Sequence, residues 1–170
     1  MRLLGLDPGL RATGWGVIEA NGNSLSHVAD GAVRPDVNAP LSERLAALYS
    51  ALRIIVEEFA PDEAAVEETF ANRNPASTLK LGQARGVVML APAQAGIPVA
   101  EYSANVIKKS LVGAGHADKG QIGAMVRMLL PGSATDSADA ADALAVAVCH
   151  AHHLTTQRRW AAGSAREARL

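Results

Sequence analysis

Four acidic residues stand where their side chains could act together on one ligand. Asp7 ends the apolar run RLLGLD, and Glu67 follows the apolar run AAV. Asp139 and Asp142 are three residues apart in DSADAADALAVAV, which places them on one face of a predicted helix. Carboxylates packed together repel each other unless they are protonated or bridged by cations, and they suit Mg²⁺ or Mn²⁺. Two such ions about 3.5–4 Å apart cleave phosphodiesters, so the pattern predicts metal-dependent phosphoryl transfer.

Each acid also has a purely structural interpretation. Asp7 opens an Asp-Pro-Gly turn, and Glu67 is a polar residue before a loop. Asp139 and Asp142 near a helix N-terminus favour the macrodipole, with Asp136 as the cap. Asp142, however, lies further into the helix than a cap needs. The decision between the two interpretations depends on whether the fold brings the four acids together.

The first strands are predicted from apolar runs separated by turn signals. An Asn-Gly dipeptide at 21–22 predicts a hairpin, so three antiparallel strands are expected at 2–7, 13–20 and 24–34. Apolar residues at helical spacing predict a helix over 41–59 with Ser42 as its cap. The strand at 63–68 follows this crossover and is expected to run parallel to the first strand.

The second half of the chain is predicted to be mainly helical. Expected elements are a helix from Pro75 to about 94, a strand at 97–103, and helices at 103–112, 118–130 and 137–152. The order predicts an α/β domain, a mixed five-stranded sheet flanked by helices. Ligands bind at the carboxyl edge of such sheets, where the strands that carry Asp7 and Glu67 would end side by side.

Length and composition limit the class of protein. A chain of 170 residues with 49% hydrophobic and 19% charged residues fits one globular domain. The single Cys149 forms no internal disulfide and excludes a zinc site built from several cysteines, which favours a reducing compartment. No apolar run approaches the roughly 18 residues of a membrane span, and Asp7 interrupts the N-terminus too early for a signal peptide. We therefore expect a cytoplasmic protein with no membrane contact.

The charges are separated along the chain although the net charge is only −1. Residues 1–72 carry 5 basic and 11 acidic groups, whereas residues 73–127 carry 7 basic and 2 acidic groups. This arrangement predicts an acidic cluster beside a surface that binds a polyanion; uneven surface decoration is the alternative. The basic residues expected to neutralise nucleic-acid phosphates are Arg73, Lys80, Arg85, Lys108, Lys109 and Lys119.

Four segments carry a resemblance to a known family. GLDPGLRATGWGVI, AVEETFANRNPASTLKLGQARGV, IKKSLVGAGHADKGQI and DSADAADALAVAV occur in that order. Together they resemble the RuvC-type Holliday-junction resolvases, which have a ribonuclease-H-like fold. The resemblance covers residues 2–153. It implies an Mg²⁺-dependent endonuclease that cuts four-way DNA junctions at two symmetric phosphodiesters during recombination and repair.

The resemblance also implies roles for individual residues. The acidic tetrad that holds two Mg²⁺ ions, with Mn²⁺ as a substitute, falls on Asp7, Glu67, Asp139 and Asp142. Glu67 is preferred to Glu68 because the acid of the family lies three residues before an aromatic residue, here Phe70. By the same likeness Lys119 is a catalytic lysine and Lys108 contacts DNA. Phe70 would stack at unpaired bases, with packing in the core as the alternative.

Partners follow from the symmetry of a junction. Two equivalent strands need two active sites, so we expect a homodimer with C₂ symmetry. The candidate contact is the helix with Gly82 and Gly86, and its apolar residues have ordinary core packing as the alternative; they are Leu79, Leu81, Val87, Val88, Met89 and Leu90. The resemblance implies branch-migration motor proteins as further partners. The nuclease domain is expected to end at 153, and 154–170 to form a flexible tail.

Other functions are possible from the residues alone. A related nuclease could act on RNA or a flap, and a junction-binding protein could lack turnover, although converging carboxylates repel phosphate. The opening segment with Gly14 and Gly16 also resembles the phosphate motif of actin-like ATPases, but the chain has no room for the second domain those enzymes need. His150, His152 and His153 are expected at a helix C-terminus, where cations favour the dipole, rather than in a zinc site.

Overall fold

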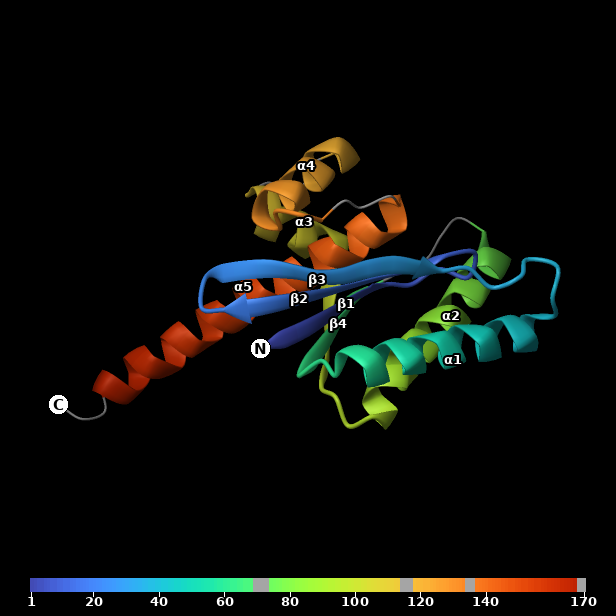
Figure 1. Cartoon of the computed structure of the whole chain (residues 1–170), viewed down its shortest axis with the longest axis horizontal. Coiled ribbons are helices and arrows are strands. Elements are labelled where there is room, and N and C mark those ends of the chain that lie inside the picture. The colour runs from blue at the N-terminus through green and yellow to red at the C-terminus, as the bar shows by residue number, and fades with distance from the viewer. Residues whose placement is uncertain (69–73, 114–117, 134–136, 168–170) are drawn as a thin grey trace.

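The computed structural model describes residues 1–68, 74–113, 118–133 and 137–167, and side chains as far as Gln157 apart from that of Lys119. Two predicted DNA contacts, Phe70 and Arg73, lie outside the described residues. Figure 1 shows one central sheet with helices on both of its faces.

The sheet has the predicted mixed topology. Its spatial order is β3-β2-β1-β4-β5. β1 pairs antiparallel with β2, and β2 with β3, whereas β1, β4 and β5 are parallel to one another. The strands are β1 (Arg2–Asp7), β2 (Thr13–Asn21), β3 (Ser24–Val33), β4 (Glu63–Glu68) and β5 (Val99–Ser103). The predicted mixed sheet of five strands, with these strand directions, is confirmed.

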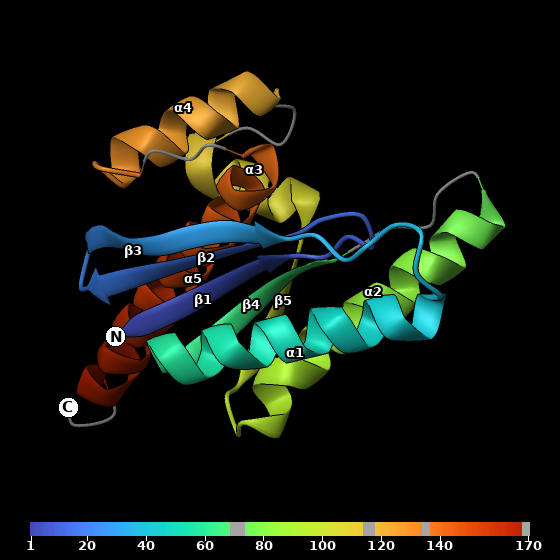
Figure 2. The same ribbon diagram turned by 45° about the vertical axis from the view of Figure 1, so that its right-hand side comes forward.

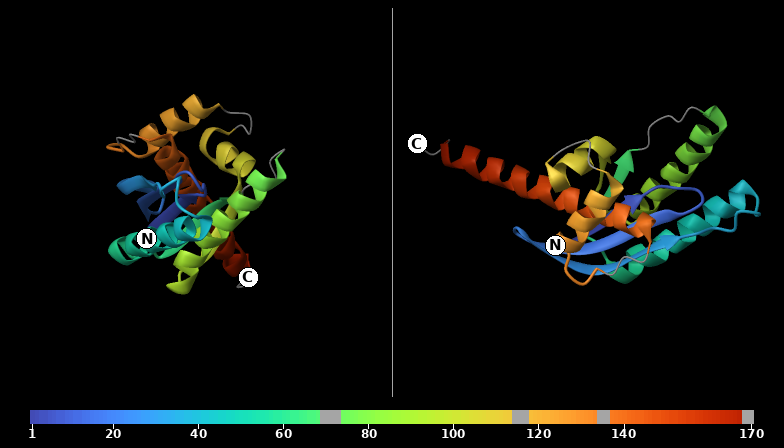
Figure 3. Two further views of the ribbon diagram at one scale, coloured as in Figure 1. Left: turned by 90° about the vertical axis from the view of Figure 1, so that its right-hand side faces the viewer. Right: turned by 90° about the horizontal axis from the view of Figure 1, so that it is seen from above.

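The helices form two layers. The first two cover one face of the sheet and the other three lie against the opposite face (Figures 2 and 3). A separate apolar core fills each side. The helices are α1 (Leu41–Phe59), α2 (Pro75–Gln94), α3 (Ala104–Val112), α4 (Lys119–Leu129) and α5 (Ala138–Glu167). Among the described residues, no helix combines the length and the apolar character that crossing a bilayer would require.

Two sequence-based predictions about helix ends are wrong. Ser42 is not the cap of α1: it lies in the first turn, and Pro40 precedes the helix without a side-chain cap. α5 does not end near 152 but continues to Glu167, through most of the segment expected to be irregular. Leu, Gln, Arg, Ala and Glu all have high intrinsic helix propensity and make up most of this segment, so it can be helical without an apolar period. The flexibility of 154–170 and the domain boundary remain predictions.

Two glycines let α5 lie unusually close to the sheet. A Cβ atom on Gly14 would stand 1.9 Å from the Asp139 carbonyl oxygen, and one on Gly5 would stand 2.1 Å from that of Ala143. Any side chain at these positions would push the helix outward, since real Cβ contacts are never this short. Gly14 also pairs with Asp7 across β1 and β2. The absence of side chains here therefore brings the acidic end of α5 to the end of β1.

Candidate active site

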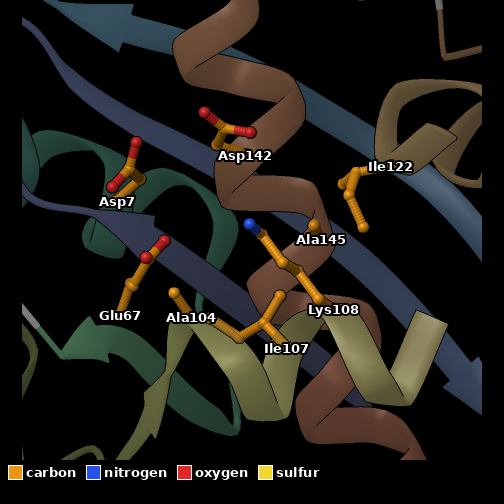
Figure 4. Close-up of a pocket in the computed structure, with 8 residues that line it drawn as sticks. All are labelled: Asp7, Glu67, Ala104, Ile107, Lys108, Ile122, Asp142 and Ala145. Carbon is orange, nitrogen blue, oxygen red and sulfur yellow. The ribbon is translucent and has the colours of Figure 1, made fainter. Parts of the chain in front are cut away.

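Three of the four predicted acids line one cavity at the carboxyl edge of the sheet. Asp7 ends β1, Glu67 lies near the end of β4, and Asp142 projects from α5 (Figure 4). Because Leu6 pairs with Val66 in the parallel register, the next residue on each strand, Asp7 and Glu67, reaches the same edge. The cavity has a volume of about 260 Å³. The predicted convergence is thus observed for these three side chains.

Among the described lining residues, those facing the carboxylates are apolar except for one cation. This cation is Lys108 of α3, and Figure 4 shows its ammonium group directed toward the carboxylates. The apolar lining comes from α3, α4 and α5: Ala104, Ile107, Ile122 and Ala145. Low-dielectric walls strengthen the attraction between a cation and an anionic ligand. Lys108, predicted only as a DNA contact, therefore lies in the same cavity as the three acids.

Asp139 is the one predicted acid that does not line this cavity. Its Oδ2 accepts a hydrogen bond of 2.9 Å from Nη2 of Arg34, which follows β3. Both side chains are partly exposed, so this ion pair is weak. Sequence reasoning did not single out Arg34, because its partner is 105 residues away along the chain.

The carboxylate oxygens in the cavity suit a hard divalent cation, but they do not surround a single point. Carboxylate oxygens from three elements face one cavity, and oxygen is the donor that Mg²⁺ prefers. Within the described part of the chain, no group of three Asp, Glu, His or Cys side chains is close enough to hold a metal ion as placed.

The remaining predicted basic residues are spread over other surfaces. Lys80 lines a second cavity near the first turns of α1 and α2. Lys109 lines a groove between α3 and α5 together with His152. Arg85 forms an ion pair with Glu101 of β5, so its charge is already compensated. Lys119 begins α4, and its side chain lies outside the described residues.

A buried polar network that sequence reasoning missed lies further along α5. His150 is within the helix, not at its C-terminus, and is only 2% exposed. Its Nδ1 lies 2.9 Å from the Tyr102 hydroxyl, and its Nε2 lies 3.2 Å from Oε2 of Glu63. Burial lowers the pKa of His150, although the Glu63 charge opposes this shift. Burial also raises the pKa of Tyr102 to about 12, which keeps the phenol protonated.

The sheet order, the helices on both faces and the acids at the edge of the central strands define a nuclease of the ribonuclease-H-like class. A family model described as crossover junction endodeoxyribonuclease RuvC matches residues 3–150. The chain therefore belongs to the RuvC family of crossover junction endodeoxyribonucleases and is an enzyme.

Individual members of the family match this chain over nearly their full length. The crossover junction endodeoxyribonuclease RuvC of Paramagnetospirillum magneticum is 62% identical over 98% of this chain and 100% of the relative. That of Rhodospirillum rubrum is 64% identical over 90% of both chains. The structure of T. thermophilus RuvC in complex with a Holliday junction substrate superimposes with a TM-score of 0.86. It is 32% identical and covers 92% of this chain and 96% of that one.

Proposed function

We propose that this chain cuts four-way DNA junctions by metal-dependent hydrolysis of two symmetric phosphodiesters, in recombination and repair. The observation that carries the proposal is the cavity in which Asp7, Glu67 and Asp142 face Lys108. A protein that only bound DNA would gain nothing from three carboxylates that repel phosphate. The T. thermophilus relative, which was solved with a Holliday junction substrate, supports this choice of DNA.

A nuclease of this family depends on a divalent metal, and we propose two Mg²⁺ ions, with Mn²⁺ as a substitute. When bound, such ions activate water and stabilise the leaving oxygen. Asp7, Glu67 and Asp142 would hold them from three sides, and Asp139 would join after leaving Arg34. No other ligand type is needed, since the donors are all oxygen atoms.

The cations of the chain would hold and orient the phosphate. Lys108 lies opposite the carboxylates and would bind a non-bridging oxygen of a phosphate in the cavity. A cation near developing negative charge stabilises the transition state more than the ground state. We assign Lys119 the same kind of role from the family resemblance.

Two coordinated cuts require two copies, and α2 offers a surface for the contact. Leu79 is 66% exposed and Leu90 is 46% exposed, and a Cβ atom placed on Gly82 or Gly86 would meet open space beyond the backbone of α2 itself. Val88 is fully buried in the core, so its predicted place in the contact is wrong. A pair of such helices could approach closely because glycine has no side chain. The homodimer, and branch-migration motors as partners, remain parts of the proposal.

The site of action is proposed to be the cytoplasm. Cys149, the single cysteine of the chain, is buried and forms no disulfide. Burial raises the pKa of its thiol to about 11, which keeps it protonated and unreactive. Such a thiol is compatible with a reducing compartment.

Asp7→Asn tests the assignment by separating binding from cleavage. The change removes a ligand charge with almost no change in volume, so folding and junction binding should persist while cleavage is lost. Affinity should stay equal or increase, because one negative charge facing phosphate has gone. Circular dichroism, junction binding in EDTA and cleavage in Mg²⁺ are the three measurements. Cleavage at the wild-type rate would exclude Asp7 from the site.

A further inference from the structure

A second cavity, of about 440 Å³, lies beside the turn that follows β1. Three cationic side chains from three different elements line it: Arg11 after β1, Arg44 of α1 and Lys80 of α2. None of its described lining residues is acidic. The remaining lining residues are Leu10, Val37, Ser77 and Leu81. Three converging positive charges without a carboxylate produce a strongly positive local potential, which an anion would reduce.

The turn that carries Arg11 is held in place from both sides. The buried Thr13 hydroxyl donates to the Gly9 carbonyl at 2.7 Å, and the Gly9 N–H donates to the Thr13 hydroxyl oxygen at 3.2 Å. Arg44 Nη2 donates to the Leu10 carbonyl at 2.8 Å. The exposed Arg11 therefore extends from a fixed backbone, which lowers the entropy cost of binding.

Arg44 still has hydrogen-bonding capacity in this cavity. Its side chain lines the cavity, and its guanidinium group has more donors than the one that anchors the turn. A guanidinium group presents five N–H donors in a planar fork that matches a phosphate. The anchoring bond to Leu10 uses Nη2 only. Arg44 can thus fix the turn and contact an anion at once.

The beginning of α2 contributes side chains rather than backbone amides. The N–H groups of Ala76 and Ser77 already donate to the Asn74 side chain, which caps the helix. An anion in the cavity would instead meet the Ser77 hydroxyl and the Lys80 ammonium. The positive end of the helix dipole adds to this attraction.

The position of the cavity relates it to the acidic site. Arg11 follows Asp7 by four residues, which span at most about 14 Å. The first turns of α1 and α2 lie at the same end of the sheet as the carboxyl edge of β1 and β4 (Figures 1 and 2). Because the two sites are separated by a short and fixed stretch of chain, a DNA strand that reaches both would place its phosphates within about four nucleotides of each other.

We propose that this cavity binds one backbone phosphate of the DNA strand, at a fixed offset from the scissile phosphate. The identity of the DNA rests on the proposed function, whereas the anion site rests on the three cations. Holding a neighbouring phosphate would set which phosphodiester faces the carboxylates, because the strand between the two sites has a limited length.

The first experiment measures salt dependence of binding without cleavage, in Ca²⁺ or EDTA. Arg11→Ala should weaken junction binding about fivefold at 0.1 M salt and reduce the slope of log K against log salt by about one. Arg11→Lys should restore most of the slope. Arg53→Ala is the matched control, because Arg53 is an exposed arginine of α1 paired with Glu57, and it should behave as wild type. Equal slopes for wild type and Arg11→Ala would overturn the proposal.

The second experiment locates the phosphate. Junctions with a single neutral methylphosphonate at successive positions around the cut should reveal one position, within about four nucleotides, that weakens the wild type. The methylphosphonate at that position should not weaken the binding of Arg11→Ala any further. A double-mutant cycle that combines the protein and DNA changes detects this coupling. Additive losses at every position would overturn a defined phosphate site. Repeating the salt series on linear duplex separates the two claims: a slope difference there supports the cavity even if junction cleavage fails.

Discussion

Polar side chains of β4 and α5 lie close together at two places, one at each end of the strand, and their surroundings differ. At the carboxyl end of β4, Glu67 and Asp142 line a cavity with half-buried carboxylates and a lysine opposite. Near its beginning, Glu63 contacts His150, which is almost completely buried and also contacts Tyr102. The same strand and helix thus present polar groups to a ligand at one end and to each other at the other end.

The difference teaches which polar groups to regard as functional. The His150 network consists of contacts among groups inside the protein, so its removal should affect folding. The cavity gathers several carboxylates at a site open to a ligand, where like charges repel each other and a bound cation would stabilise them. Similar residue types therefore have different roles according to whether they line a cavity open to a ligand or lie in the core.

The largest effect should come from Glu67, and its neighbour provides a matched control. Glu67→Gln removes one carboxylate from the cavity and should lower the cleavage rate at least about 100-fold. Glu68→Gln changes an adjacent residue of β4 that does not line the cavity, and it should have little effect. Single-turnover cleavage of a junction measures both. Equal losses of cleavage rate in the two variants would contradict a specific role for Glu67.

The buried network should respond in stability instead. His150→Ala leaves a gap and removes the partner of Tyr102 and Glu63, so the free energy of unfolding should fall by about 3 kcal/mol. Cleavage per folded molecule should be unchanged. Gln157→Ala, at an exposed position of the same helix, should change stability by less than about 0.5 kcal/mol. Urea unfolding gives both free energies. Loss of cleavage in a stably folded His150 variant would contradict the assignment of a purely structural role to this network.

The smallest effect concerns Arg34, which engages Asp139 outside the cavity. Arg34→Gln removes an exposed ion pair worth up to about 1 kcal/mol, so the concentration of divalent metal needed for half-saturation should fall by up to about fivefold. Mn²⁺ binding measured by electron paramagnetic resonance, without DNA, gives this value. Arg53→Gln breaks a similarly exposed pair with Glu57 and serves as control. Weaker Mn²⁺ binding in Arg34→Gln would mean that Arg34 orients Asp139 as a ligand.

Much of the fold could be predicted because its signals are local. The Asn-Gly hairpin and the helix crossover before β4 determine the order and sense of the strands. The end of α5 could not be predicted from apolar periodicity, since residues after 152 have no such period and are still helical. The first turn of α1 likewise has no side-chain cap to recognise.

The site was predictable where strand ends determine it and not where long-range contacts do. Asp7, Glu67 and Asp142 meet because two parallel strands end together and α5 crosses their edge. The pair between Arg34 and Asp139 joins segments 105 residues apart, which no spacing reveals. The choice between neighbouring cations depends on how α3 is rotated, and only the structure places Lys108 in the cavity.

The central claim is tested most directly by substrate choice under metal control. A labelled four-way junction, a linear duplex of the same sequence and an RNA–DNA hybrid are each incubated with Mg²⁺ or EDTA. The account predicts symmetric cleavage of the junction in Mg²⁺, none in EDTA, and little cleavage of the other two substrates. Cleavage in EDTA would contradict the metal-dependent mechanism. Preferential cleavage of the hybrid, or junction binding without turnover in Mg²⁺, would contradict the proposed function.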